Sequence, residues 1–247
     1  MRTIPDKLKK CDDLQKQINA IKPLQKEELE QLKAYYRIRL VYSSNAIEGN
    51  SLTETETKIV IENGLTIAGK PLKDHLEAVG HSEAFDLVLR LSEQKGIQEQ
   101  DILDIHRLFY QKIDPLNAGK YRTIRVFISG SSYNVPPPQK IQELMKKFVC
   151  ELNTLEKNNH PVIYAALLHK NFVMIHPFID GNGRTARLLM NLALLQYGYQ
   201  IAIIPNVLRN EYLQSLEECH RGNDTNFITL VINAVLESQS DYIRLLK

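Results

Sequence analysis

The sequence predicts an all-α fold that carries one small β-hairpin. Apolar residues recur at spacings of three and four along most of the 247 residues, which is the period of a buried helix face. Glycine, asparagine and proline separate these stretches at intervals that suit helices joined by short loops. Residues 121–137 break the pattern, because they are rich in β-branched and aromatic types. We expect one compact unit.

The composition is that of an ordinary folded protein, with 43% hydrophobic and 24% charged residues. The 31 basic and 29 acidic side chains leave a net charge of +2, so no direct binding of nucleic acid is expected. The three cysteines lie far apart without a CxxC pair, which suggests neither a disulfide framework nor a zinc knuckle. Neither a secretory signal nor a bilayer-spanning stretch is evident. We therefore expect a cytoplasmic protein without a membrane partner.

The first long helix is predicted over residues 25–47. One stripe of it carries apolar or small side chains at the helical spacing: Leu29, Leu32, Tyr36, Leu40, Ser43 and Ile47. The stripe stops at Glu48-Gly49-Asn50, where glycine and asparagine suit a helix C-terminus. Thr53 and Glu56 then have capping-box spacing, so a short helix should follow and end near residue 62.

The remaining helices are predicted over residues 72–94, 98–112, 139–157, 161–174, 183–197, 207–219 and 224–239. The hairpin lies before the third of these. Tyr121–Ile128 is predicted as a strand, Ser129–Ser132 as the turn, and residues 133–135 as the returning strand before three prolines. A lone hairpin is marginally stable, so its edge is available to pair with another chain.

A loop that can bind an anion lies between the helices predicted at 161–174 and 183–197. Pro177 disfavours helix at His176, and Gly181 and Gly183 let the backbone turn tightly and approach a ligand. The following helix offers unpaired N–H groups and the positive end of its dipole.

Charged side chains complete this site. Arg184 and Arg187 place two cations on one side of the first helical turn. Asp180 has little use in binding an anion alone, but it suits a Mg²⁺ ion that bridges phosphates. His176 lies at the edge, where a neutral imidazole can accept a hydroxyl proton. Each feature is ordinary by itself, and their combination within twelve residues points to phosphate chemistry.

Residues 176–187, HPFIDGNGRTAR, match HxFx(D/E)GNGRxxR at every defined position and so resemble the motif of the Fic family. The resemblance implies a Fic-fold helical bundle and transfer of AMP from ATP to a Ser, Thr or Tyr hydroxyl of a target protein. It implies that His176 deprotonates the hydroxyl and that Asp180 binds Mg²⁺.

The same resemblance assigns the phosphate contacts. The backbone of Gly181, Asn182 and Gly183, together with the Asn182 and Arg184 side chains, would hold the α- and β-phosphates. Arg187 would contact the γ-phosphate. Doc-type kinases of the wider superfamily carry lysine in place of the second glycine, so the glycine at 183 favours AMP transfer.

Two further segments resemble the family. Residues 118–145 are similar to its flap, which would position a target protein by main-chain pairing over about 122–135. Four flap residues are expected to border the nucleotide: Val126, Phe127, Ile128 and Ser129. Arg209-x-x-Tyr212 resembles a pattern in which the tyrosine lines the adenosine pocket. His220 stands where animal relatives have an asparagine near the nucleotide.

An inhibitory element is implied upstream of the motif. Ser44, Glu48 and Gly49 fit the family pattern (S/T)xxxE(G/N), and the first two share a face near the end of the long helix. If Glu48 reaches Arg187, it occupies the cation that the γ-phosphate needs.

The resemblance then divides the chain into two parts. Residues 1–95 would be an N-terminal helical region with the inhibitory helix at about 25–50, and residues 96–240 the catalytic core.

Other activities stay open. Animal relatives use the same glutamate to align a water that removes AMP, so a de-AMPylase or a bifunctional enzyme is the main alternative. A non-catalytic module that binds peptides through the hairpin edge is another, although it gives no reason for Asp180 beside a base. The apolar faces of residues 52–90 can support a homodimer. Five histidines lack metal-ligand spacing and are expected to be structural: His75, His81, His106, His160 and His169.

Overall fold

The computed structural model describes residues 3–21 and 24–246, and within them it contains helices and loops but no strand. The α-helices are α1 (Ile4–Ala20), α2 (Lys26–Ile47), α3 (Glu54–Asn63), α4 (Leu72–Leu91), α5 (Glu99–Tyr110), α6 (Ile141–Lys157), α7 (Pro161–Ile175), α8 (Asn182–Gln196), α9 (Arg209–His220) and α10 (Thr225–Leu245). Two short 3₁₀ helices, η1 (Pro138–Lys140) and η2 (Asn206–Leu208), precede α6 and α9. The prediction of an all-α fold is confirmed.

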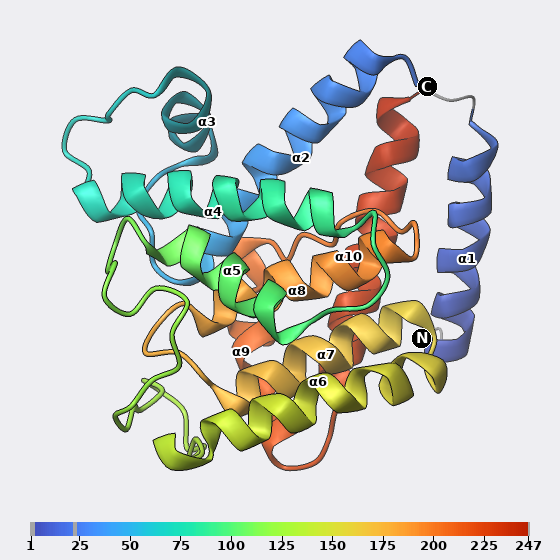
Figure 1. Cartoon of the computed structure of the whole chain (residues 1–247). Coiled ribbons are helices and arrows are strands. Elements are labelled where there is room, and N and C mark those ends of the chain that lie inside the picture. Colours follow the sequence, from blue (N-terminus) through green and yellow to red (C-terminus); the bar gives the residue numbers. More distant parts are fainter. Residues whose placement is uncertain (1–2, 22–23, 247) are drawn as a thin grey trace.

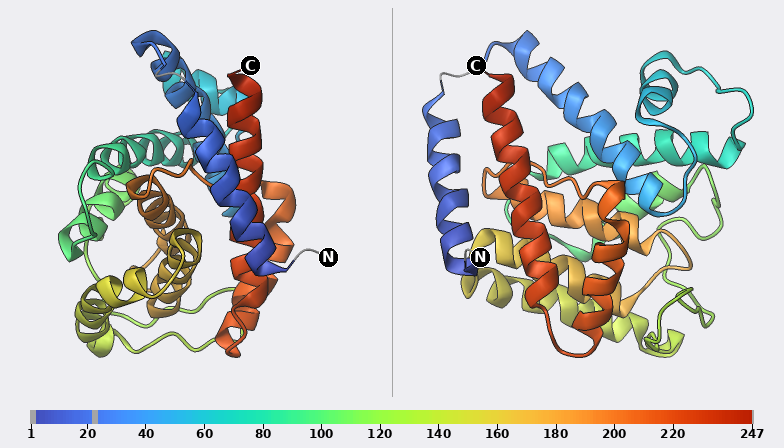
Figure 2. Two further views of the ribbon diagram at one scale, coloured as in Figure 1. Left: turned by 90° about the vertical axis from the view of Figure 1, so that its right-hand side faces the viewer. Right: turned by 180° about the vertical axis from the view of Figure 1, so that it is seen from behind.

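Helix α8 is the centre of the fold (Figure 1). It packs against α7, α4 and α5, and the side chains of Leu188, Leu189, Met190 and Leu192 are fully buried. Helix α6 covers α7, while α10 packs against α7 and α9 and is itself covered by α1 (Figure 2). Most residues of α8 are buried, the polar ones of its first turns included. Its N-terminus is therefore enclosed by the neighbouring helices.

Helix α2 brings the N-terminal part of the chain to that end of α8. A small apolar cluster of Val41, Leu52, Val60 and Ala78 joins α2 to α3 and α4. Helix α2 also contacts α8 directly. The last turn of α2 therefore lies next to the α7–α8 junction, although more than a hundred residues of sequence separate the two.

The predicted helices from α2 to α10 are all present, with ends that differ by a few residues. The capping box of Thr53 and Glu56 is formed as predicted. Helix α1 was not predicted as a separate element. Its start carries a second capping box, between Thr3 and Asp6, with proline in the first turn. That signal was present in the sequence, but the segment has many lysines and few apolar residues.

The predicted β-hairpin is not formed in the structure. Residues 121–137 form a loop. Two backbone hydrogen bonds are present in it: Ser131 N–H donates to the Ile128 carbonyl across a turn, and Arg122 N–H donates to the Pro177 carbonyl. The β-branched residues do not form a strand here, because the described part of the chain offers no neighbouring strand to pair with.

In the part of the chain that the structure covers, no helix is both long and apolar enough to cross a bilayer. The three cysteines are free thiols, as the spacing predicted.

Candidate active site

The α7–α8 junction is a short, tightly held loop. His176 ends α7 in the left-handed conformation, with φ 51° and ψ 58°, and it is the only non-glycine residue with positive φ among those described. Asn182 fixes the loop from the other side, because its amide accepts from Phe178 N–H and donates to the Phe178 carbonyl, both at 2.9 Å. Strained backbone of this kind persists where the surroundings over-determine it and is common at functional sites.

The N-terminus of α8 forms the anion site. Gly181 precedes the helix with φ 77°, a conformation that favours glycine. The first N–H groups of the helix have no carbonyl partner within it, so they and the helix dipole face the loop. Because the Asn182 side chain is engaged on Phe178, its backbone N–H is what remains for a ligand.

Arg187 lies beneath this end of α8 and is held by α2 and α9. Its Nε donates to Ser44 Oγ at 2.9 Å, and an NH2 nitrogen contacts the Ser44 carbonyl at 2.8 Å and Glu48 Oε1 at 2.7 Å. The other terminal nitrogen donates to the Tyr212 hydroxyl at 3.1 Å, which also meets His169 Nε2. The guanidinium is 3% exposed and has partners on all sides.

Glu48 covers the first turn of α8. A Cβ atom built on Gly183 would lie 2.5 Å from Glu48 Oε1, so the carboxylate rests directly on this glycine. Partial burial acts to raise the pKa of the Glu48 carboxyl, but the guanidinium groups of Arg187 and Arg184 outweigh it and lower the pKa below its usual range. At neutral pH a carboxylate therefore stands in the anion site.

The end of α2, which carries Glu48, is anchored by α9. Arg209 Nε donates to the Ile47 carbonyl at 2.7 Å. A helix C-terminus has unpaired carbonyls and favours cations, so this contact stabilises the last turn.

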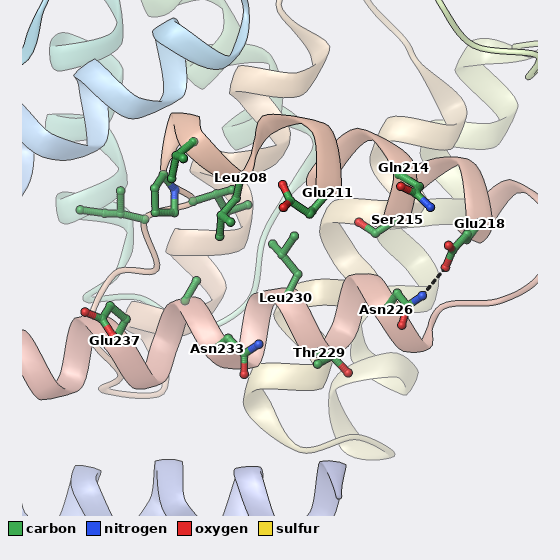
Figure 3. Close-up of a pocket in the computed structure, with 15 residues that line it drawn as sticks. Leu208, Glu211, Gln214, Ser215, Glu218, Asn226, Thr229, Leu230, Asn233 and Glu237 are labelled. Atoms are coloured by element: carbon green, nitrogen blue, oxygen red, sulfur yellow. Dashed lines mark hydrogen bonds between the residues drawn. The ribbon is translucent and has the colours of Figure 1, made fainter. Parts of the chain in front are cut away.

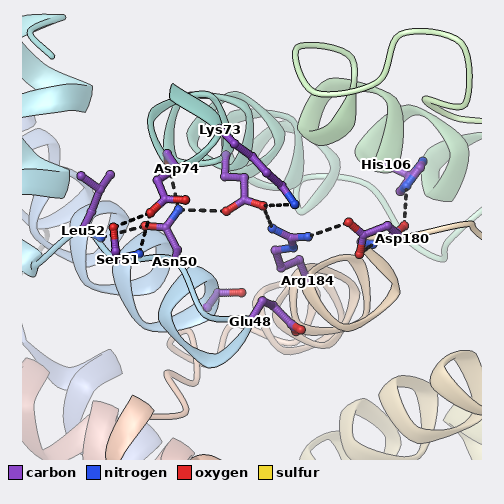
Figure 4. A network of polar contacts seen from close by, with 12 residues as sticks. Glu48, Asn50, Ser51, Leu52, Lys73, Asp74, His106, Asp180 and Arg184 are labelled. Atoms are coloured by element: carbon purple, nitrogen blue, oxygen red, sulfur yellow. Dashed lines mark hydrogen bonds and ion pairs between the residues drawn. The ribbon is translucent and has the colours of Figure 1, made fainter. Parts of the chain in front are cut away.

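The second motif arginine, Arg184, has a different carboxylate partner. Its NH1 lies 2.7 Å from Glu77 Oε1, and its NH2 lies 3.5 Å from Asp180 Oδ2. Figure 4 shows these side chains in one polar network between α4 and α8. The guanidinium also lies over the Phe109 ring, 4.4 Å from its centroid.

His176 is suited to accept a proton. Burial, together with the charge of Arg122, lowers the pKa of its imidazole to about 4, so the ring is neutral at pH 7. Arg122 donates three bonds to carbonyls, those of His176, Ile124 and Pro136. This buried arginine joins the backbone of His176 to both ends of the 121–137 loop.

The outer part of that loop rests on α9. The Tyr133 ring stacks on His220, with centroids 3.9 Å apart and planes at 15°. The Tyr133 hydroxyl donates to the Met174 carbonyl at 3.0 Å, and Ser132 Oγ donates to Glu217. Phe127 is 89% exposed, and Val126, Ile128 and Ser129 form the rest of this outer stretch.

The structure gathers most of the predicted residues into one place. His176, Asp180, Arg184, Arg187 and Glu48 surround the N-terminus of α8 together with the glycine-rich turn. Ser44 and Tyr212 lie beneath them, on Arg187.

Three residues in this region were not singled out from the sequence: Glu77, Arg122 and Tyr133. A glutamate in a helix carries no signal of its own. Arg122 is one of two arginines, with Arg125, in an otherwise β-branched and aromatic run, and the sequence alone did not distinguish it.

The histidines predicted to be structural are packed within the fold. His106 stacks on Phe178 at 3.6 Å and accepts from Gly119 N–H, while His75 accepts from Ile67 N–H. His160 caps α7, and His81 and His169 are fully buried.

Among the described residues, no group of three or more His, Cys, Asp or Glu side chains is arranged to hold a metal. A groove of about 650 Å³ lies elsewhere, between α9 and α10 (Figure 3), and its lining does not include the motif residues.

The described part of the chain is all-helical, and one helix N-terminus gathers a neutral histidine, a carboxylate that is 46% exposed and two arginines. This arrangement is typical of loops that bind phosphate. A sequence profile of the Fic/DOC family matches residues 96–194. The protein adenylyltransferase Fic of Drosophila grimshawi is 37% identical over 206 residues, which is 82% of this chain and 42% of that protein. The protein of the same name from Nematostella vectensis is 37% identical over 207 residues, covering 82% and 48% of the two chains.

Solved structures of Fic proteins have the same fold as this chain. A fragment of Fic-1 from C. elegans superposes with a TM-score of 0.88 at 32% identity and covers 97% of this chain and 72% of that one. A Fic-domain signaling protein from Bacteroides thetaiotaomicron gives a TM-score of 0.87 at 26% identity, covering 97% and 96%. The chain belongs to the Fic/DOC family. It spans less than half the length of the two animal relatives above.

Proposed function

We propose that this chain is a protein adenylyltransferase that moves AMP from ATP-Mg²⁺ to a Ser, Thr or Tyr hydroxyl of a target protein. The observation that carries the proposal is the neutral His176 at the edge of an anion site that Arg184 and Arg187 flank. The relatives named protein adenylyltransferase Fic support it.

In the proposed step, the hydroxyl oxygen attacks the α-phosphorus of ATP. The bond from the α-phosphorus to the bridging oxygen breaks, pyrophosphate leaves, and His176 takes the hydroxyl proton. The N–H groups of Asn182 and Gly183 and the Arg184 guanidinium would bind the α- and β-phosphates, and Arg187 would bind the γ-phosphate. Positioning and charge neutralisation are what such a transfer needs from a protein.

Asp180 would hold the Mg²⁺ ion. Its side chain is 46% exposed, and the nearest cation, Arg184, lies 3.5 Å from its Oδ2. Proteins commonly bind Mg²⁺ through one or two carboxylates plus the phosphates of the substrate, so a single aspartate at the mouth of an anion site fits this ion. Mg²⁺ would neutralise negative charge on the phosphates.

In this proposal Glu48 is an intramolecular inhibitor. Its carboxylate engages Arg187 and covers Gly183, where the phosphates of ATP would lie. Ser44 fixes Arg187 in the same position. The proposed arrangement thus has an N-terminal helical region, residues 1–95, whose inhibitory helix at about 25–50 acts on a catalytic core, residues 96–240.

The 121–137 loop is the proposed docking site for the target protein. Phe127 is exposed, and the extended backbone over about 122–135 can accept a strand of another chain. Four of its residues, Val126, Phe127, Ile128 and Ser129, would border the nucleotide, and Tyr212 would lie near the adenosine. A homodimer through α3 and α4 is proposed as well, since Leu65 and Leu72 are 59% and 68% exposed.

De-AMPylation by the same site is the second candidate function. Glu48 favours it, because the carboxylate stands at the anion site with 35% of its side chain exposed and its pKa lowered. An ionised carboxylate in that position can orient a water molecule toward a phosphorus atom.

Labelled ATP separates these functions. We expect Glu48→Gly to incorporate more label than the wild type, and Glu48→Gly/His176→Ala to incorporate none. Equal labelling by the double variant would refute the role of His176. Release of AMP from a modified target by the wild type, and its loss in Glu48→Gly, would identify the de-AMPylase instead.

A further inference from the structure

Glu77 on α4 forms the tightest contact of Arg184. The two groups meet at 2.7 Å, and their side chains are 6% and 3% exposed. Charges removed from water are screened little, so a short buried pair fixes the guanidinium more firmly than an exposed pair would.

Asp180 competes for the same guanidinium from the solvent side. It lies 3.5 Å away and is 46% exposed, so solvent screens its charge. An exposed ion pair at this distance contributes little to binding energy. In the observed structure the Arg184 guanidinium lies nearer to Glu77, at 2.7 Å, than to Asp180, at 3.5 Å. Figure 4 shows Asp180 beside Arg184.

Glu77 is itself held in place. Its Oε2 accepts from Asn50 Nδ2 at 2.9 Å, and Lys73 lies 3.7 Å from Oε1. Phe109 lies against the face of the Arg184 guanidinium. The pair is thus locked between α4, α5 and the loop after α2.

We propose that Glu77 is a positioning residue that keeps Arg184 away from Asp180, so that the Asp180 carboxylate is available to a divalent cation. The inference rests on the proposed function, in which Asp180 holds the metal of ATP-Mg²⁺. Without the charge of Glu77, Arg184 is a buried cation whose nearest anion is Asp180. The guanidinium then turns to Asp180 and takes the oxygens that the cation needs.

Direct binding of Mn²⁺ tests the proposal. The background is Glu48→Gly, with the non-hydrolysable analogue AMPPNP present, and electron paramagnetic resonance measures free Mn²⁺. Adding Glu77→Gln, which keeps the shape and removes the charge, should weaken Mn²⁺ binding about two- to fivefold, the range for a part-exposed ion pair. The matched control is Glu83→Gln, on the same helix and paired with Lys112 at 3.0 Å, which should change nothing.

Unchanged Mn²⁺ affinity in the Glu77→Gln variant overturns the proposal, as does an equal loss in the Glu83→Gln control. If Glu77→Gln does not fold, a crystal structure of Glu48→Gly with AMPPNP and Mn²⁺ decides. Arg184 on Glu77 with Asp180 on the metal supports the proposal, and Arg184 on Asp180 overturns it. The proposed function fails separately, if Glu48→Gly transfers no label at all.

Discussion

Glu48 and Arg187 stand 139 residues apart in the sequence and meet at 2.7 Å in the fold. The contact uses the buried cation of α8, and the same carboxylate rests on Gly183. The resting site therefore already holds an anion that belongs to the protein itself.

The close fit of Glu48 on Gly183 predicts a coupled effect on stability. Gly183→Ala places a Cβ atom 2.5 Å from Glu48 Oε1, so the carboxylate must leave its position. We expect Gly183→Ala to lower the unfolding free energy of the wild type by about 1 kcal/mol. The same change in Glu48→Gly should cost much less, because the obstructing group is gone. Thermal and urea unfolding of the four chains gives the coupling. Additive effects would mean that Glu48 does not rest on this glycine.

The pKa of His176, lowered to about 4, predicts the pH at which activity falls on the acidic side of the pH–rate profile. For Glu48→Gly, the rate of AMP transfer at saturating ATP should stay near its neutral value down to about pH 5, because the imidazole remains unprotonated. Circular dichroism at each pH confirms that the chain is folded. A limb with a midpoint near 6.5 would show that His176 is as well solvated as a free histidine.

Buried neutral histidines predict a loss of stability in mild acid. Burial lowers the pKa of His81 to about 3 and that of His106 to about 4, as for His176. In the unfolded chain these groups titrate near 6.5, so between pH 6.5 and 4 the unfolded state binds protons that the native state does not. The free energy of unfolding should fall as the pH falls, by at most about 1.4 kcal/mol per pH unit for each group. Urea unfolding from pH 7 to 5 measures how steeply the unfolding free energy changes with pH. His176→Ala should make this dependence less steep by the contribution of one histidine.

The contacts of Arg122 predict that its substitution lowers kcat without changing the KM for ATP. Its three bonds hold the His176 carbonyl and both ends of the 121–137 loop, and none of them goes to the motif arginines. In a Glu48→Gly background, Arg122→Lys should lower kcat by up to about a hundredfold through misplacement of the base, with the KM for ATP unchanged. Arg244→Lys, at an exposed position in the last turn of α10, is the control and should retain full activity. A rise in KM with unchanged kcat would assign Arg122 to nucleotide binding instead.

Local signals in the sequence located eight of the helices because their apolar faces repeat over about three or more turns, and the capping box of Thr53 and Glu56 located α3. They failed for residues 121–137, where strand propensity was real but the described residues include no strand to pair with. Helix α1 has few apolar residues, and it is held chiefly by packing against α10, a contact that periodicity does not reveal.

The site was predictable where its residues are contiguous. The segment from His176 to Arg187 carries the loop, the helix end and the charges in one stretch. Glu48 was found through a short pattern, but its contact with Arg187 depends on how α2 packs on α4 and α8. Glu77 gave no signal, since its role follows only from the position of α4 beside Arg184.

The carboxylate of Glu48, which rests on the first turn of α8, belongs to the same chain as that turn. Its local concentration is set by the geometry of α2 and stays the same however dilute the protein becomes. Neither dilution nor a free carboxylate in solution removes it. In the proposed inhibition, release of the site requires displacement of Glu48 at the end of α2, where Arg209 of α9 donates to the Ile47 carbonyl.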